Sequence, residues 1–124
     1  MWKEIVYVGV GGGLGSILRF ATSQIVSRYV QAPYLFVGTL VANLLGCLLI
    51  GILSGWLLSH ADEHHVVRWL FVVGFCGGYT TFSTFALENL HLLTQGQWPL
   101  LIGYTAVSIL LGIAAVWLGM LVVR

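Results

Sequence analysis

The sequence has very few charged residues: five Lys or Arg and four Asp or Glu make up 7% of its 124 residues, whereas 59% are hydrophobic. A soluble domain usually carries about 25% charged residues. So few polar side chains cannot cover a water-facing surface of this size, and the surplus apolar side chains are expected to face lipid. The composition therefore predicts an integral membrane protein.

The apolar residues form four long runs separated by short connections. Crossing the hydrocarbon core takes about 20 residues as a helix, and each run is long enough. The runs are continuously apolar rather than alternating, which excludes the strands of a membrane barrel. We therefore expect an all-α membrane protein, with residues 1–124 as one domain. The four predicted transmembrane helices are Ile5 to Val30, Tyr34 to Ser59, Val67 to Leu93 and Trp98 to Val123.

Cysteine is also scarce, with two residues, Cys47 and Cys76, both inside predicted spans. A disulfide between them is possible, but small free core residues are the favoured interpretation. The first apolar run is too long for a signal-peptide core and lacks a clear small-residue cleavage site, so we expect it to remain. The sequence shows no extramembrane domain or nucleotide-binding module, and no nucleic-acid partner is expected.

The most polar connection runs over residues 60–65, where three histidines flank Asp62 and Glu63. His60, His64 and His65 could bind a metal with these carboxylates, although a solvated loop is favoured. No pairing of a nucleophile with a base is visible. We therefore expect that the protein is not an enzyme.

The lysines and arginines specify the topology only weakly. An even number of spans puts Lys3, Arg68 and Arg124 on one side and Arg28 on the other, with Arg19 towards the side of Arg28. A clear excess normally fixes the orientation of a membrane protein, and three against two is not one. One interpretation is that every chain inserts with its termini inside. The other is that chains insert both ways and pair antiparallel.

Glycines four residues apart predict close helix–helix contacts, without indicating which chain supplies the partner. These pairs are Gly9 and Gly13, Gly11 and Gly15, Gly51 and Gly55, and Gly74 and Gly78. In the third span the sequence GFCGGYTTFSTF places three glycines before a dense Ser/Thr cluster. Irregular backbone within a membrane is tolerated only where it is buried or lines a cavity. We therefore predict a functional break in the third helix at Gly77 to Thr80.

Polar residues inside the spans need a partner or a wet cavity. Thr39, Asn43 and Cys47 recur every four residues in the second span, and Tyr104 and Ser108 do so in the fourth. These edges either form interhelical hydrogen bonds alone or face each other across a narrow polar track. Phe82 and Phe85 lie near one face after the break. They either pack in the core or turn the positive edges of their rings towards a small anion.

Three motifs follow one another along the chain. They are Gly11-Gly12-x-x-Gly15-x-x-x-Arg19, Gly38-Thr39-x-x-x-Asn43-x-x-Gly46, and Gly74-x-x-Gly77-Gly78-x-Thr80-Thr81-Phe82-Ser83-Thr84-Phe85-x-x-Glu88. With these motifs in this order, the sequence resembles the Fluc (CrcB) family of fluoride channels nearly end to end.

The resemblance implies a passive, fluoride-selective channel that exports fluoride across the bacterial inner membrane. It further implies an antiparallel, dual-topology homodimer with two pores, in which the main-chain carbonyls of Gly77 and Thr80 from both subunits hold a central structural sodium ion. By the same resemblance, Phe82 and Phe85 are the pore phenylalanines and Asn43 is the pore amide. The polar track would be extended by Thr39, Ser83, Thr84, Tyr104 and Ser108, with Glu88 as a further candidate.

Three positions are harder to assign. Relatives often have a serine one turn beyond Ser108, where this chain has Gly112, so Gly112 is left out of the track. Arg19 either steers anions at a pore vestibule or is a structural cap and ion-pair partner, and the structural role is favoured. Glu88 would repel an anion unless it is protonated, partnered or directed outward.

Two other functions remain open. A small dual-topology multidrug-type antiporter needs an intramembrane carboxylate, and Glu88 is the one deep acid in the sequence. An accessory subunit without transport activity would leave the broken third helix unexplained.

Overall fold

The computed structural model describes residues 1–60 and 65–123, and this part of the chain is all helical, with no strand. Four helices are long and apolar enough to cross a membrane: Trp2–Ser27, Tyr34–Ser59, Val67–Thr94 and Trp98–Val122. The prediction of four membrane-spanning helices is thus confirmed. Most of the polar connection at 60–65, including Asp62, Glu63 and His64, lies outside the described residues, as does Arg124.

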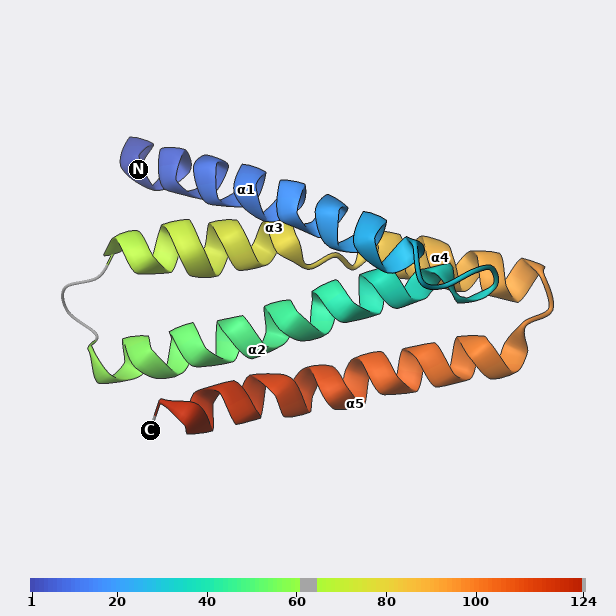
Figure 1. Cartoon of the computed structure of the whole chain (residues 1–124). Coiled ribbons are helices and arrows are strands. Elements are labelled where there is room, and N and C mark those ends of the chain that lie inside the picture. Colours follow the sequence, from blue (N-terminus) through green and yellow to red (C-terminus); the bar gives the residue numbers. More distant parts are fainter. Residues whose placement is uncertain (61–64, 124) are drawn as a thin grey trace.

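The helices lie roughly side by side, with the start of α1 and the end of α5 at the same end of the bundle (Figure 1). Helix α1 covers Trp2–Ser27, and the second span joins a 3-10 turn, η1 (Tyr34–Phe36), to α2 (Val37–Ser59). The fourth span is α5 (Trp98–Val122), with Pro99 in its first turn, where a missing amide hydrogen costs nothing. Helix α1 begins and ends three residues earlier than predicted, because apolar composition alone does not fix the ends of a helix.

The third span is the least regular. It consists of the π-helix η2 (Val67–Cys76), the short α3 (Gly77–Tyr79) and α4 (Ser83–Thr94). Residues 80–82 between α3 and α4 are not helical, and the uncoiled connection is visible in Figure 1. Gly77–Tyr79, where sequence placed the beginning of a break, are helical instead.

Glycines set the contacts between helices. An added Cβ at Gly15 would collide with the backbone of Phe75 and Tyr79, and one at Gly78 would collide with the backbone of Gly12. Gly51 lies in the same way against Val116 of α5. Gly74 and Gly78 therefore allow α1 to approach η2 and α3 closely, and helical structure continues through this glycine-rich stretch.

Few side chains are buried within one chain. Between 11% and 28% of the residues in the hydrophobic windows of the four spans are buried. The remaining apolar surface must be covered by lipid or by another protein surface, because water would make it costly.

Gly15→Ala should lower stability by about 1–3 kcal/mol, the usual cost of forcing a methyl group into a packed contact, since the new Cβ meets backbone that cannot rotate away. Thermal unfolding of the purified protein in detergent measures this. Gly13→Ala is the matched control, because nothing lies within 4 Å of a Cβ at Gly13. Equal unfolding temperatures for the two variants would contradict the packing of α1 against η2 and α3.

Candidate functional site

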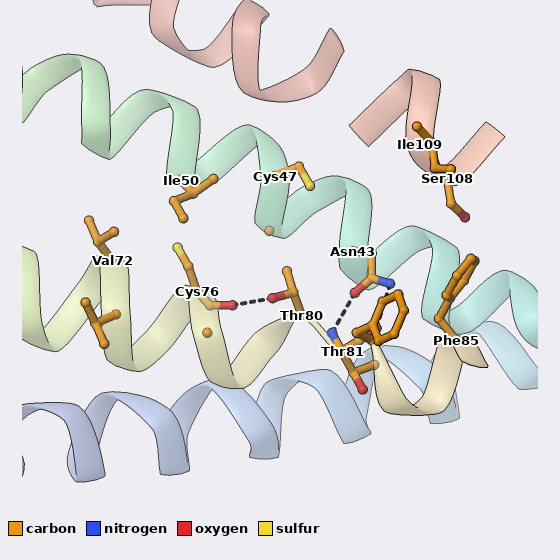
Figure 2. Close-up of a pocket in the computed structure, with 14 residues that line it drawn as sticks. Asn43, Cys47, Ile50, Val72, Cys76, Thr80, Thr81, Phe85, Ser108 and Ile109 are labelled. Carbon is orange, nitrogen blue, oxygen red and sulfur yellow. Dashed lines mark hydrogen bonds between the residues drawn. The ribbon is translucent and has the colours of Figure 1, made fainter. Parts of the chain in front are cut away.

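The non-helical residues 80–82 are held by one side chain from the neighbouring helix. Asn43 of α2 accepts a hydrogen bond from the amide of Thr81 at its Oδ1 atom (2.7 Å) and donates one from Nδ2 to the carbonyl of Thr81 (3.1 Å). Figure 2 shows the side chain of Asn43 directed towards Thr81. Both polar backbone groups of Thr81 are thus satisfied without a helix or a sheet, as groups shielded from water require.

Two further bonds fix the ends of the interruption. Thr80 is extended, with φ −87° and ψ 157°, and its hydroxyl donates to the carbonyl of Cys76 at 2.8 Å. The amide of Thr84, in the first turn of α4, donates to the hydroxyl oxygen of Thr81 at 3.2 Å. The Thr81 hydroxyl therefore gives a partner to one otherwise unpaired amide in the first turn of α4.

These bonds change the surroundings of two main-chain oxygens. In a continuous α-helix the amides of Thr81 and Thr84 would bond to the carbonyls of Gly77 and Thr80, four residues earlier. They bond instead to side-chain oxygens of Asn43 and Thr81. The carbonyls of Gly77 and Thr80 thus lose their helical donors, and these are the two oxygens that sequence comparison assigned to a metal.

A pocket of about 560 Å³ lies beside the interruption. Asn43 and Cys47 of α2, Phe85 of α4 and Ser108 of α5 border it (Figure 2). Among the described residues in its wall, none is charged. The remaining ones are Gly46, Ile50, Val72, Val73, Cys76, Gly77, Thr80, Thr81, Phe82 and Ile109.

Two neutral hydrogen-bond donors belong to residues of this wall. The Ser108 hydroxyl is buried and has no hydrogen-bond partner within the described part of the chain. An amide nitrogen carries two hydrogens, so Asn43 keeps one after its bond to Thr81. The pocket can therefore offer hydrogen bonds to an anion without a fixed positive charge.

Phenylalanines form the aromatic part of the same wall. The rings of Phe82 and Phe85 have centroids 5.7 Å apart and are tilted by 43°. Phe82 is 78% exposed, so one side of the pocket is open. The single chain thus supplies only part of an enclosure.

A second polar cluster lies next to this pocket. The hydroxyls of Thr39 and Tyr104 donate to the two carboxylate oxygens of Glu88, each at 2.9 Å. Thr39 and Tyr104 are buried, and they reach Glu88 from α2 and α5. Three residues that sequence placed on a polar track therefore meet, and Glu88 is partnered.

Not all predicted site residues join these two groups. Ser83 and Thr84 lie at the start of α4, within 3.4 Å and 3.3 Å of the Thr81 hydroxyl, and neither borders the pocket. Arg19, on α1, is partly exposed. In the described residues the ion pair that forms joins the amino terminus to Glu4 and does not include Arg19.

Sequence reasoning missed the part played by two residues. Thr81 supplies both the backbone groups held by Asn43 and the hydroxyl that bonds to the first turn of α4, and its place in the Ser/Thr cluster was the available signal. Phe36 stacks on Tyr104 with ring centroids 4.4 Å apart, and no motif marked it. Cys47 and Cys76 are free thiols, as the favoured interpretation predicted.

Four helices long and apolar enough to cross a membrane define a multi-pass membrane protein, with an open, mostly apolar pocket beside residues 80–82. This chain belongs to the CrcB-like protein family (Camphor Resistance, CrcB), whose sequence model matches residues 6–120. Its relatives include a fluoride-specific ion channel FluC of Flavobacterium psychrophilum, 39% identical over 122 residues and covering 98% of both chains. Proteins of the same name from Azobacteroides pseudotrichonymphae and Pseudomonas syringae pv. tomato are 44% and 41% identical. These alignments cover 96% and 100% of this chain and 94% and 99% of the relatives.

Asn43→Ala should lower stability by about 2 kcal/mol or more, because each backbone group left shielded without a partner costs about 1–3 kcal/mol. The amide of Thr81 should also exchange its hydrogen faster. Thermal unfolding in detergent and hydrogen exchange test the two effects. Asn89→Ala is the control, since Asn89 makes one long contact with Thr105 at 3.4 Å. An unchanged unfolding temperature and exchange rate for Asn43→Ala would refute the role of Asn43.

Proposed function

We propose that the protein is a fluoride-selective channel that lets fluoride leave the cytoplasm passively and so lowers its internal concentration. Relatives that align over nearly their whole length are named fluoride-specific ion channels. The observation in this chain that carries the proposal is the pocket beside residues 80–82, with neutral donors, phenylalanine rings and no charge in its described wall. Such named relatives are channels, in agreement with the prediction that the chain is not an enzyme.

The chemistry of the pocket suits a small anion in transit. Hydrogen bonds from Asn43 and Ser108 replace part of the hydration shell, and the positive edges of the Phe82 and Phe85 rings add weak attraction. Conduction requires binding that is favourable enough to enter and weak enough to leave. A lysine or arginine in the wall would hold the anion too firmly, whereas neutral donors release it.

The open side of the pocket favours a second copy of the chain as its cover. We propose an antiparallel homodimer with two pores, in which the partner encloses Phe82. The weak charge bias of three against two supports insertion in both orientations. The interruption at residues 80–82 would then lie at mid-membrane, lining a cavity as non-helical backbone must. The bacterial inner membrane is the proposed location.

A structural sodium ion at the centre of this dimer is the proposed cofactor. The donor set fits, because the carbonyl oxygens of Gly77 and Thr80 have lost their helical amides and hard cations prefer oxygen ligands. Gly77 is also exposed on the surface of the single chain. Two such oxygens from each subunit would give four neutral ligands, and the bound ion would supply positive charge at the interface.

Other predicted residues take supporting roles in this proposal. Thr39, Glu88 and Tyr104 extend the polar track, with two hydroxyl donors offsetting the charge of the carboxylate. The hydroxyls of Ser83 and Thr84 bond to the hydroxyl of Thr81 at the start of α4 and would add polar groups beside the pocket. Arg19 lies outside the pocket wall and has a structural or vestibule role.

Reconstituted liposomes should release fluoride and retain chloride, as recorded with ion-selective electrodes under valinomycin.

Phe85→Ile should lower fluoride flux about tenfold, equivalent to roughly 1.4 kcal/mol, because the ring edge is removed from the wall. Phe71→Ile is the matched control, since Phe71 borders a different, apolar pocket. Size-exclusion chromatography checks assembly. Equal permeation of chloride and fluoride would rule out selectivity. Unchanged fluoride flux in Phe85→Ile would mean that the Phe85 ring only packs against its neighbours and does not attract the anion.

The antiporter alternative is tested by separating ion flux from proton movement. A passive pore should give the same fluoride flux with and without a protonophore, after subtraction of protein-free liposomes. An antiporter using Glu88 should instead move a cationic substrate against its concentration gradient when a proton gradient is imposed. Glu88→Gln should abolish that movement. Uphill transport that disappears in Glu88→Gln would replace the channel proposal.

A further inference from the structure

A smaller pocket, of about 140 Å³, lies at the end of the bundle formed by α4 and the connection before α2. Glu88, His91 and Gln95 border it, and their spacing of three and four residues puts them on one face of α4. Pro33 and Phe36 form part of the facing wall. Since a water molecule occupies about 30 Å³, the pocket has room for a small ion with some of its water.

Tyr104 connects this smaller pocket with the larger one. Its hydroxyl donates to Glu88 at 2.9 Å and its ring stacks on Phe36, and both of these residues border the smaller pocket. The same ring also meets Phe85 edge-on, with centroids 5.0 Å apart, and Phe85 borders the larger pocket. Tyr104 therefore lies between the two cavities.

The outer part of the smaller pocket carries an ionisable group that none of the motifs includes. His91 is exposed, whereas Glu88, one turn earlier, is partly buried. From α4 the titratable groups in the described wall are Glu88 and His91. The connection contributes Ala32, Pro33, Leu35 and Phe36, which do not titrate, and Arg28 at the end of α1 is not in the wall. From the side of α5, Tyr104 reaches the carboxylate.

We propose that this smaller pocket is an outer fluoride-binding site, in which the protonated imidazole of His91 draws the anion towards Tyr104. The inference rests on the proposed channel function. His91 donates a charge-assisted hydrogen bond to fluoride, and Gln95 offers its amide hydrogens. The imidazolium also offsets the negative charge of Glu88, which would otherwise repel an anion at the same place.

The proposal sets the direction of a pH effect. The attraction requires the protonated imidazole, so it is present at the acid end of the range and lost as the pH rises. Charge lining a cleft raises the rate at which an oppositely charged ion enters. For unit charges roughly 5 Å apart in water-like surroundings, the gain is about fourfold. This fourfold gain in fluoride flux should appear at fluoride concentrations well below saturation, because entry of the ion then limits the flux.

The experiment measures initial fluoride efflux from liposomes containing the full chain, with equal pH on both sides, at pH 6 and at pH 8. Protein-free liposomes are subtracted at each pH to remove leakage of hydrogen fluoride. The unmodified chain should be about fourfold faster at pH 6. His91→Gln should be slow at both values, and His91→Lys, which keeps its charge, should be fast at both. His65→Gln is the matched control, because His65 lies just before η2, at the end of the third span opposite His91.

The outcomes separate the inference from the channel proposal. If the unmodified chain conducts fluoride equally at both pH values, or if His91→Gln keeps the fourfold dependence, the site at His91 is refuted and the channel stands. If His65→Gln removes the dependence instead, the site is also refuted. If no fluoride passes at either pH, the channel proposal itself fails. Size-exclusion chromatography of each variant confirms that the assembly is unchanged, and His91→Asn repeats the test should His91→Gln not assemble.

Discussion

The paired hydrogen bonds between the Asn43 amide and the backbone of Thr81 are the constraint on which the site depends. Within a hydrophobic environment an unpaired backbone amide or carbonyl costs several kcal/mol, so a chain cannot leave its helix unless something replaces the lost bonds. One side chain on α2 does so for both groups of Thr81. Because the Thr81 amide bonds to Asn43, it no longer bonds to the carbonyl of Gly77 as it would in a continuous helix. The side-chain amide of Asn43 thus permits the irregular segment and also leaves the Gly77 carbonyl oxygen without its helical donor.

The sequence predicted the number of spanning helices, because composition and run length carry that information directly, and it placed the limits of every span except the first to within one residue. It was less successful in the third span. There the glycines suggested weakness at Gly77, yet Gly74 and Gly78 are used for contact with α1, and the helix continues through them. The non-helical residues are 80–82, where Asn43 of the neighbouring α2 supplies hydrogen bonds to the backbone. Such a partner is a tertiary feature, which local composition does not encode.

The candidate site was likewise foreseen in its parts rather than in its connections. Polar spacing placed Thr39 and Tyr104 on edges of the second and fourth spans that could bond or face each other, but it gave no indication that Glu88 would join their hydroxyls. Ser83 and Thr84 have the chemistry of a polar track, and their position at the start of α4 uses it for local bonds instead. Hydroxyl groups serve caps and ligands equally well, so residue type could not distinguish the two uses.

Tyr104 participates in three contacts with a single rigid ring: a stack on Phe36, an edge towards Phe85 and a bond to Glu88. A phenol cannot swing aside without changing all three together. A movement of this ring would therefore break both ring contacts and the bond to Glu88 together, leaving Thr39 as the donor to the carboxylate. If the proposed fluoride path runs past Tyr104, its width and the exposure of the carboxylate beside it must change together.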